Sequence, residues 1–352
     1  MANNFKDIRA YRVSWILWFT DLFTVFPLLQ IWSWRTTKGI RLDYLGDRKR
    51  IENDIKHGAF FMTNHRDIIM DAAWLSYLLS IRYHIRPYMG VGNNLFAKKW
   101  IEVVMRYLRC FVVKRNGGAH AQLENAKHLS AYIRSLRARG KSIWLAQREG
   151  RAKDSNDLTQ ASVLHMLTMD EGMNGLKDEG MNGLKDERSL FENVKALNIC
   201  PVSITYEFDP CDYLKAAEMQ LKRDDPKWRK SKKDDVLSMH TGIRGKKGRV
   251  VYRLTPSINP EIDAMLAAHP ELKNANTHEQ LQSVCDIIDR HIHQGYEIYE
   301  RGTDFDAYIE GQLKKINIPN KDEQFLRERL IEMYSNPVKN HQIAVESLKK
   351  KV

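Results

Sequence analysis

The chain has 352 residues, of which 43% are hydrophobic and 28% are charged, and 56 Lys and Arg against 44 Asp and Glu leave a formal net charge of +12. This composition predicts a globular protein of one large or two modest domains and excludes a fibrous or mostly disordered chain. The four widely spaced cysteines exclude a zinc ribbon and favour a reducing compartment, and the positive charge leaves nucleic acid, a phospholipid surface and phosphorylated small molecules open as partners.

Residues 13–34 are the most apolar stretch, with Trp near both ends and Arg and Lys on both flanks, as expected at a membrane interface. Asp21 and Pro27 disfavour a straight transmembrane helix, because a central Asp costs about 2.5–3.5 kcal/mol on insertion and Pro interrupts the helical hydrogen bonds. We therefore expect residues 1–46 to form a helical, membrane-associating segment, as a bent hairpin or an interfacial helix. The alternative is an apolar helix packed on the protein's own core.

Residues 47–260 alternate short apolar runs with longer amphipathic ones, which is typical of an α/β domain. An amphipathic helix is predicted over 121–138. Buried strands are predicted at 59–63, 110–113, 142–146, 199–205 and 250–254.

Three further segments have weaker signals. Residues 170–185 contain a perfect tandem octamer, DEGMNGLK, whose composition predicts a surface loop without a role. The basic residues of 227–249 predict either a solvated surface or an anion-binding or membrane-facing patch. Residues 261–352 predict a helical C-terminal region, in which His291 and His293 are expected on the surface because residues two apart on a helix do not share a face.

The strongest chemical signal follows the strand at 59–63, where the chain continues as Asn64-His65-Arg66-Asp67. A His at the carboxyl end of a buried strand, where a helix begins, lies where α/β sheets place ligands. Its imidazole can act as a general base if a carboxylate holds the other ring nitrogen, and both Asp67 and Asp71 are candidates. The alternative is a helix cap beside an ordinary surface His. A protein-kinase catalytic loop is excluded, because no kinase motif accompanies the His-Arg-Asp triplet.

Four blocks of sequence within 59–259 occur in the order and spacing of one known family. Their residues are Asn64, His65 and Asp71, then 111–115, then 144–151, and finally 199–202 around Pro201. With these blocks the chain resembles the glycerolipid acyltransferases related to lysophosphatidic acid acyltransferase, as a divergent, bacterial-type member.

Two features depart from the family pattern. Five residues separate His65 from Asp71 where the family has four, so on an ideal helix at 100° per residue the two side chains would lie about 240° apart. The pair therefore requires His65 to lie outside the helix or next to a bulge, and otherwise Asp67 is the orienting carboxylate. In the third block Arg148 replaces Pro, and Arg151-Ala152 replaces Thr-Arg, which keeps an acceptor other than lysophosphatidic acid open.

The resemblance implies a mixed β-sheet flanked by helices and an O-acyltransferase that uses acyl-CoA or acyl-carrier protein, with no metal, no further cofactor and no acyl-enzyme. His65 would be the base and Asp71 or Asp67 its partner. Arg115, Arg148 and Arg151 would bind phosphates, because guanidinium groups match phosphate oxygens. Glu149 and Gly150 match the acceptor-binding block, and we place Asn64 with these substrate-binding residues.

The expected partners are a membrane phospholipid surface and the acyl donor, with no nucleic acid and with the oligomeric state open. The expected location is the cytoplasmic face of a membrane, as a peripheral or monotopic protein. The acceptor is expected to be a lysophospholipid or glycerol phosphate, and another lyso-lipid, such as an amino-acid-containing one, is the alternative within the enzyme class. A non-enzymatic basic protein that binds membranes or nucleic acid is the rival class. It predicts that His65, its carboxylate, Glu149 and the arginines lie apart rather than in one cleft open to an apolar groove.

Overall fold

The structure is a computed structural model of the chain and describes residues 24–92, 105, 108–114, 118–169 and 189–349. The described residues form a seven-stranded sheet in the order β1-β7-β6-β2-β5-β3-β4. Its strands are β1 (Thr37–Tyr44), β2 (Phe60–Thr63), β3 (Tyr88–Gly92), β4 (Cys110–Val113), β5 (Ile143–Ala146), β6 (Ile199–Tyr206) and β7 (Gly248–Leu254). β6 and β7 pair antiparallel and all other neighbours pair parallel, so the expectation of a mixed sheet is confirmed.

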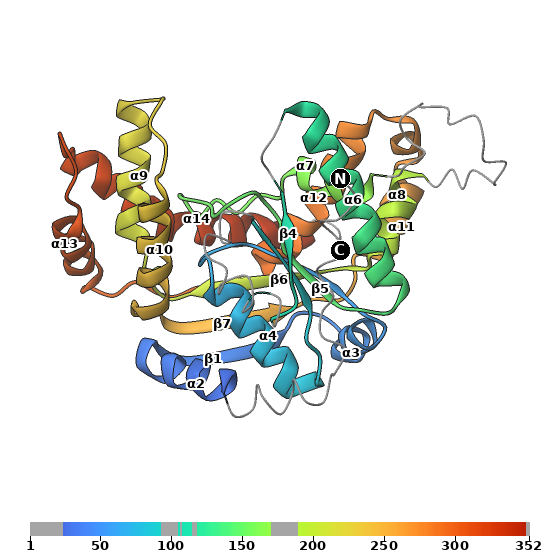
Figure 1. Ribbon diagram of the computed structural model, residues 1–352, viewed down its shortest axis with the longest axis horizontal. Helices are drawn as coiled ribbons and strands as arrows, with labels where there is room; N and C mark the ends of the chain where they lie inside the picture. Colours follow the sequence, from blue (N-terminus) through green and yellow to red (C-terminus); the bar gives the residue numbers. More distant parts are fainter. Residues whose placement is uncertain (1–23, 93–104, 106–107, 115–117, 170–188, 350–352) are drawn as a thin grey trace.

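Helices cover both faces of this sheet, as Figure 1 shows. Those in the first half of the described chain are α2 (Val25–Thr36), α3 (Arg48–Lys56), α4 (Met70–Tyr83), α6 (Ala119–Ala138), α7 (Ala161–Thr168) and α8 (Leu190–Leu197). Those in the second half are α9 (Asp212–Asp224), α10 (Lys232–Arg244), α11 (Asn259–Ala268), α12 (Thr277–Gln294), α13 (Phe305–Lys315) and α14 (Glu323–Lys349), with a short 3-10 helix at Pro270–Asn274.

Alternation along the buried strands divides the core into two layers. Phe60 and Met62 of β2 pack with α6, α7, α8, α11 and α12, whereas Phe61 between them packs with α3 and α4 on the other face. β5 follows the same rule, since Ile143 and Trp144 lie in different layers. Successive side chains of a strand point to opposite faces, so apolar runs of this kind require helices on both sides.

All five predicted strands are present, and the helix predicted at 121–138 is α6. Two strands, β1 and β3, were not predicted. β1 lies within the segment expected to be helical and membrane-associating, which is wrong for Thr37–Tyr44. β1 pairs with β7 alone, and at such an edge the polar sequence TKGIRLDY is tolerated because each of its residues is half-buried or exposed. β3 has the sequence YMGVG, whose two glycines hide the strand pattern.

The C-terminal region is helical as expected, and α12 contributes to the same apolar cluster as the sheet. The expectation that His293 lies on the surface is wrong, because its side chain is buried and its Nε2 lies 2.8 Å from the carbonyl oxygen of Asp157. α13 and α14 form a third cluster with α9. The boundaries at 46 and 260 stay predictions.

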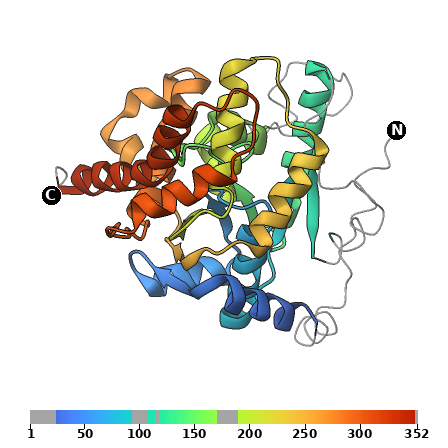
Figure 2. The ribbon, with the colours of Figure 1, turned by 90° about the vertical axis from the view of Figure 1, so that its left-hand side faces the viewer.

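The apolar N-terminal stretch is described only from residue 24 onward, and its first part, like the repeat at 170–185, lies outside the described residues. Within α2, Phe26 is buried, whereas Leu28, Ile31 and Trp34 are exposed, Trp34 by 83%. Among the described residues no helix is long and apolar enough to cross a membrane. In Figure 2, α2 lies below α10 and α9 on the side that faces the viewer.

Candidate active site

The turn between β2 and α4 brings His65 and Asp71 together. His65 Nδ1 lies 2.9 Å from Asp71 Oδ2. α4 begins only at Met70, so His65 lies outside the helix and residues 65–69 are not helical. The five residues between His65 and Asp71 therefore do not keep the two side chains apart, because His65 lies outside the helix, which is one of the geometries that the sequence left open.

Asp71 is fully buried and its carboxylate is held by several donors. Oδ2 also accepts the backbone N–H groups of Arg66 and Asp67, at 2.6 and 2.9 Å, and Oδ1 accepts the hydroxyl of Tyr206 at 2.8 Å. Tyr252 donates to the backbone carbonyls of Met70 and Asp71. An ionised Asp71 therefore receives the Nδ1–H of His65 and leaves Nε2 of the ring for a substrate proton.

Asp67 has a different position. Its Oδ1 accepts the backbone N–H groups of Ile69 and Met70 at the start of α4. Its Oδ2 is buried without a hydrogen-bond partner among the described residues, and an added Cβ on Gly242 would meet this atom at 2.0 Å. Burial and the negative charge of Asp71 raise the pKa of the Asp67 carboxyl. Asp71, and not Asp67, is the carboxylate hydrogen-bonded to His65, and a catalytic role for either stays a prediction.

Asn64 does not line the cavity beside His65. Its side chain is fully buried and exchanges hydrogen bonds with the backbone of Ile204, at 2.9 and 2.7 Å. It thereby joins the end of β2 to β6. This geometry favours positioning of the turn over the substrate contact predicted for Asn64.

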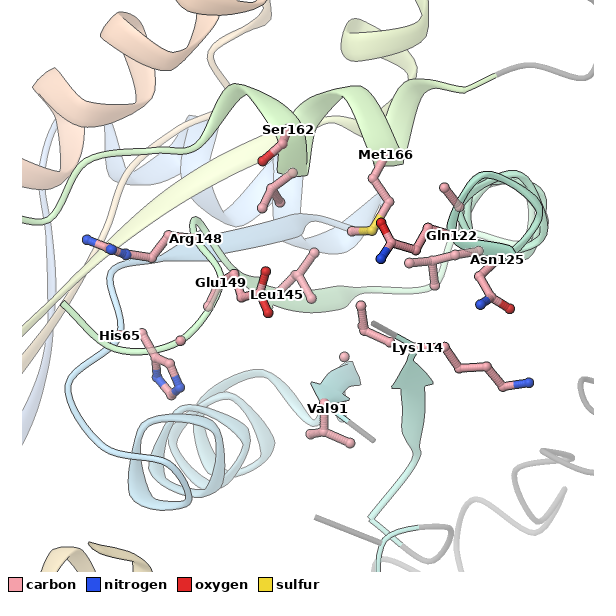
Figure 3. Close-up of a pocket in the computed structure, with 18 of the residues that line it drawn as sticks. His65, Val91, Lys114, Gln122, Asn125, Leu145, Arg148, Glu149, Ser162 and Met166 are labelled. Atoms are coloured by element: carbon pink, nitrogen blue, oxygen red, sulfur yellow. The ribbon is translucent and has the colours of Figure 1, made fainter. Parts of the chain in front are cut away.

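The loop after β5 carries the third block of residues to the same cavity. His65, Arg148, Glu149, Gly150 and Arg151 all line one cavity of about 600 Å³. Figure 3 shows His65, Arg148 and Glu149 at one end of this cavity and Lys114, Gln122 and Asn125 at the other. Gly150 has a φ of +69°, a conformation that favours glycine and turns the chain between the two arginines.

Much of the cavity wall is apolar. These lining residues come from β3, β4, β5, α6 and α7 and include Val91, Val113, Leu123, Leu129, Leu145, Val163 and Met166. His65, Glu149, Arg148 and Arg151 therefore line one cleft with an apolar side, as predicted, whereas Asp71, the carboxylate that contacts His65, is fully buried and does not line it. The rival class had predicted their dispersal.

Cations surround the polar end of the cavity. Burial lowers the pKa of Arg151, but Cys211, Asp209 and Asp67 outweigh burial and raise it, so its guanidinium stays charged. Burial, together with the charge of Arg151, lowers the pKa of Lys153 to about 8, although Lys153 pairs with Glu218 at 2.7 Å. Lys114 also lines the cavity, whereas Arg115 lies outside the described residues.

A buried ion pair behind the site was not predicted. Arg66 Nη2 lies 2.7 Å from Asp157 Oδ2, and both side chains are almost fully buried. Asp157 Oδ2 also accepts the Tyr296 hydroxyl at 2.7 Å, and the backbone carbonyl of Asp157 contacts His293. Tyr296 and His293 thus hold Asp157 in the loop after β5, and Asp157 in turn holds Arg66 in the turn that carries His65. Arg66 is part of the Asn-His-Arg-Asp motif, but nothing in the neighbouring sequence indicates that its partner is Asp157, about 90 residues later.

No group of three or more His, Cys, Asp or Glu side chains in the described part of the chain could hold a metal ion. The expectations of no metal and no further cofactor stay predictions.

Comparison with known proteins places this geometry in context. No match is found among the curated proteins. Residues 44–202 match the family model described as Acyltransferase, the family of glycerolipid acyltransferases that includes lysophosphatidic acid acyltransferase, and the matched range contains His65, Asp71 and the loop at 148–151. The family resemblance is confirmed at this level for 44–202, and the bacterial-type subfamily stays a prediction.

Proposed function

We propose that the protein is a membrane-associated O-acyltransferase that transfers a fatty acyl group from acyl-CoA or acyl-carrier protein to a hydroxyl of a lysophospholipid or glycerol phosphate. The observation that carries this proposal is the His65–Asp71 hydrogen bond at the end of a cavity that has cations on one side and apolar side chains on the other. The family match of 44–202 supports acyl transfer in general.

The proposed step is a direct transfer. His65 Nε2 removes the proton of the acceptor hydroxyl, whose oxygen attacks the thioester carbonyl. The new C–O bond forms, the C–S bond breaks, and His65 returns the proton to the leaving thiolate. Asp71 stabilises the imidazolium that exists between these two proton transfers. Because both substrates bind together, no acyl-enzyme is needed.

The surroundings of His65 suit both substrates. Arg148, Arg151 and Lys153 offer positive charge to a phosphate of the acceptor or of the donor. Glu149 can accept a hydrogen bond from a glycerol hydroxyl. The apolar wall formed by β3, α6 and α7 offers a dry surface to an acyl chain.

A lipid surface as partner is supported by α2. Its exposed side chains Leu28, Ile31 and Trp34 lie three residues apart, so they share one face of the helix. Arg35 and Lys38 follow directly and can contact lipid phosphates. We propose that the protein acts at the cytoplasmic face of a membrane, as a peripheral or monotopic protein.

The test of this function is a transfer assay with a panel of acceptors. The full chain is incubated with a radiolabelled acyl donor, either acyl-CoA or acyl-carrier protein, and with one acceptor at a time: glycerol 3-phosphate, lysophosphatidic acid, other lysophospholipids or an amino-acid lyso-lipid. We expect an acylated product with a phosphorylated acceptor and none with His65→Ala. Lipid mass spectrometry of cells with and without the active protein identifies the natural product. Absence of any esterified product across the panel would contradict the proposal.

A further inference from the structure

We infer that the tip of the α9–α10 hairpin, residues 222–237, is the docking surface for a small acidic protein that carries the acyl group on a phosphopantetheine arm. This inference rests on the proposed function and names, for the donor, acyl-carrier protein over acyl-CoA. Figure 1 shows α9 above α10, with a connecting loop that runs down from the upper end of α9 to the start of α10.

The tip carries positive charge that the protein itself does not neutralise. Four of its basic side chains are exposed and have no carboxylate partner among the described residues: Lys227, Arg229, Lys232 and Lys233. Cations in this state attract an acidic surface with little loss of existing contacts.

The acidic residues of the tip are already engaged. Asp224 pairs with Arg223 at 2.8 Å, and Asp235 pairs with Lys230 at 2.9 Å. Asp225 accepts the backbone N–H of Lys227, and Asp234 accepts from Ser231 at the start of α10. Asp225 and Asp234 keep their negative charges, so residues 222–237, with seven Lys and Arg against four Asp, carry a net charge of +3.

The same hairpin borders the candidate active site. Lys230 and Asp235 line the cavity that contains His65, and Glu218 of α9 pairs with Lys153 of the cavity wall. A protein that docks on the tip thus lies beside the cavity, and a flexible arm attached to it can carry a thioester toward His65. Val236 and Leu237, exposed by 60% and 47%, add apolar contact area next to the cations.

The position of the tip favours a protein over an anionic membrane. α10 has 13 residues, which at 1.5 Å per residue gives a length of about 20 Å. Its far end contacts α2, where the Arg244 guanidinium lies 6.0 Å from the Trp32 ring, and both views place α2 at the opposite end from the tip. If α2 rests on a bilayer, the tip cations lie beyond the screening length of about 8 Å at physiological salt and gain little from lipid charge.

The test compares two double charge reversals in the full chain. Lys232→Glu with Lys233→Glu alters the tip, and Lys49→Glu with Lys56→Glu, two exposed lysines of α3, is the control with the same change in net charge. Binding of hexadecanoyl acyl-carrier protein is measured directly by surface plasmon resonance, and transfer is measured with the carrier-bound and the CoA-bound acyl group.

We expect the tip variant to lose about 10- to 100-fold in carrier affinity and in kcat/KM with the carrier, whereas acyl-CoA kinetics change by less than about threefold and the α3 variant behaves like the wild type. Carrier binding that is absent in the wild type, or equal in the tip variant, overturns the docking surface. So does a tip variant that loses only binding to vesicles containing anionic phospholipid, because the patch then faces the membrane. If the docking surface is overturned but acyl-CoA still supports transfer that depends on His65, the proposed function stands. If neither donor supports transfer, the proposed function is refuted, whereas the docking surface is still judged by the carrier-binding measurement alone.

Discussion

The turn that carries His65 and the loop after β5 meet at one cavity, yet they treat their polar groups in opposite ways. In the turn, Asp71 receives hydrogen bonds from His65, Tyr206 and two backbone N–H groups. In the loop, Arg148 Nε and Arg151 Nη1 are buried without an acceptor among the described residues. The turn holds the Asp71 carboxylate by hydrogen bonds within the protein, whereas the loop keeps two guanidinium groups beside the cavity with no ion pair to a carboxylate among the described residues.

Both sides of this comparison are testable, and the largest effect is expected in the turn. Asp71→Asn should lower kcat by about 10²- to 10⁴-fold, because an amide neither stabilises an imidazolium nor fixes the tautomer of His65. Asp67→Asn is the matched control and should lower kcat by less than about tenfold, because its Oδ1 can still accept the N–H groups at the start of α4. Steady-state kinetics below the melting temperature of each variant measure both values. Equal losses would remove the distinction between the two carboxylates.

In the loop, Arg148→Ala should act on binding more than on chemistry. Loss of a charged hydrogen bond to phosphate is worth about 1.5–3 kcal/mol, so KM for a phosphorylated acceptor should rise about 10-fold or more while kcat changes little. A neutral monoacylglycerol serves as the control acceptor, and its KM should not respond. A fall in kcat alone would show that Arg148 does not bind the ground-state phosphate.

A smaller effect is expected from the support of the turn. Tyr206→Phe removes the hydrogen bond to Asp71 Oδ1 and should lower kcat by about 2- to 10-fold, from a contribution of about 0.5–1.5 kcal/mol. Tyr252→Phe is its counterpart, since this hydroxyl contacts the backbone carbonyls of Met70 and Asp71 and the Tyr206 side chain, but not the Asp71 carboxylate. Only Tyr206→Phe should change the pH profile of kcat. The same change in both variants would indicate a packing effect.

The smallest effect is a pH dependence in the loop. Burial lowers the pKa of Lys153 to about 8, so this ammonium is charged below pH 8 and loses its proton as the pH rises further. KM for an anionic acceptor should therefore rise a few-fold between pH 7 and 9. Lys153→Arg keeps its charge and should abolish that rise. An unchanged pH dependence of KM in Lys153→Arg would exclude Lys153 from anion binding.

The same two regions explain what the sequence could predict. The strands at 59–63 and 142–146, with the polar residues at their ends, could be predicted from the sequence because an apolar run followed by charged residues is a local pattern. The geometry of His65 and Asp71 was not readable, because an ideal helix separates them and only the observed start of α4 at Met70 brings them together. Edge strand β1 and glycine-containing β3 lacked the required pattern.

Long-range partners were beyond sequence reasoning for a different reason. Arg66 contacts Asp157, and Asp157 contacts Tyr296, across separations of more than 90 residues. Tyr206 is the last residue of β6, one position beyond the predicted strand, and its contact with Asp71 depends on the β2–β6 pairing. Such contacts follow from the strand order, which periodicity does not specify.

The central claim is that His65, held by Asp71, is the base for acyl transfer. Its most direct test is single-turnover transfer to the identified acceptor from the donor that the wild type uses, acyl-CoA or acyl-carrier protein, comparing the wild type with His65→Ala at saturating concentrations of both substrates. We expect His65→Ala to retain the melting temperature, the binding of both substrates and the binding to vesicles, but to lose transfer by at least about 10³-fold. Transfer by His65→Ala at a rate near that of the wild type would contradict it.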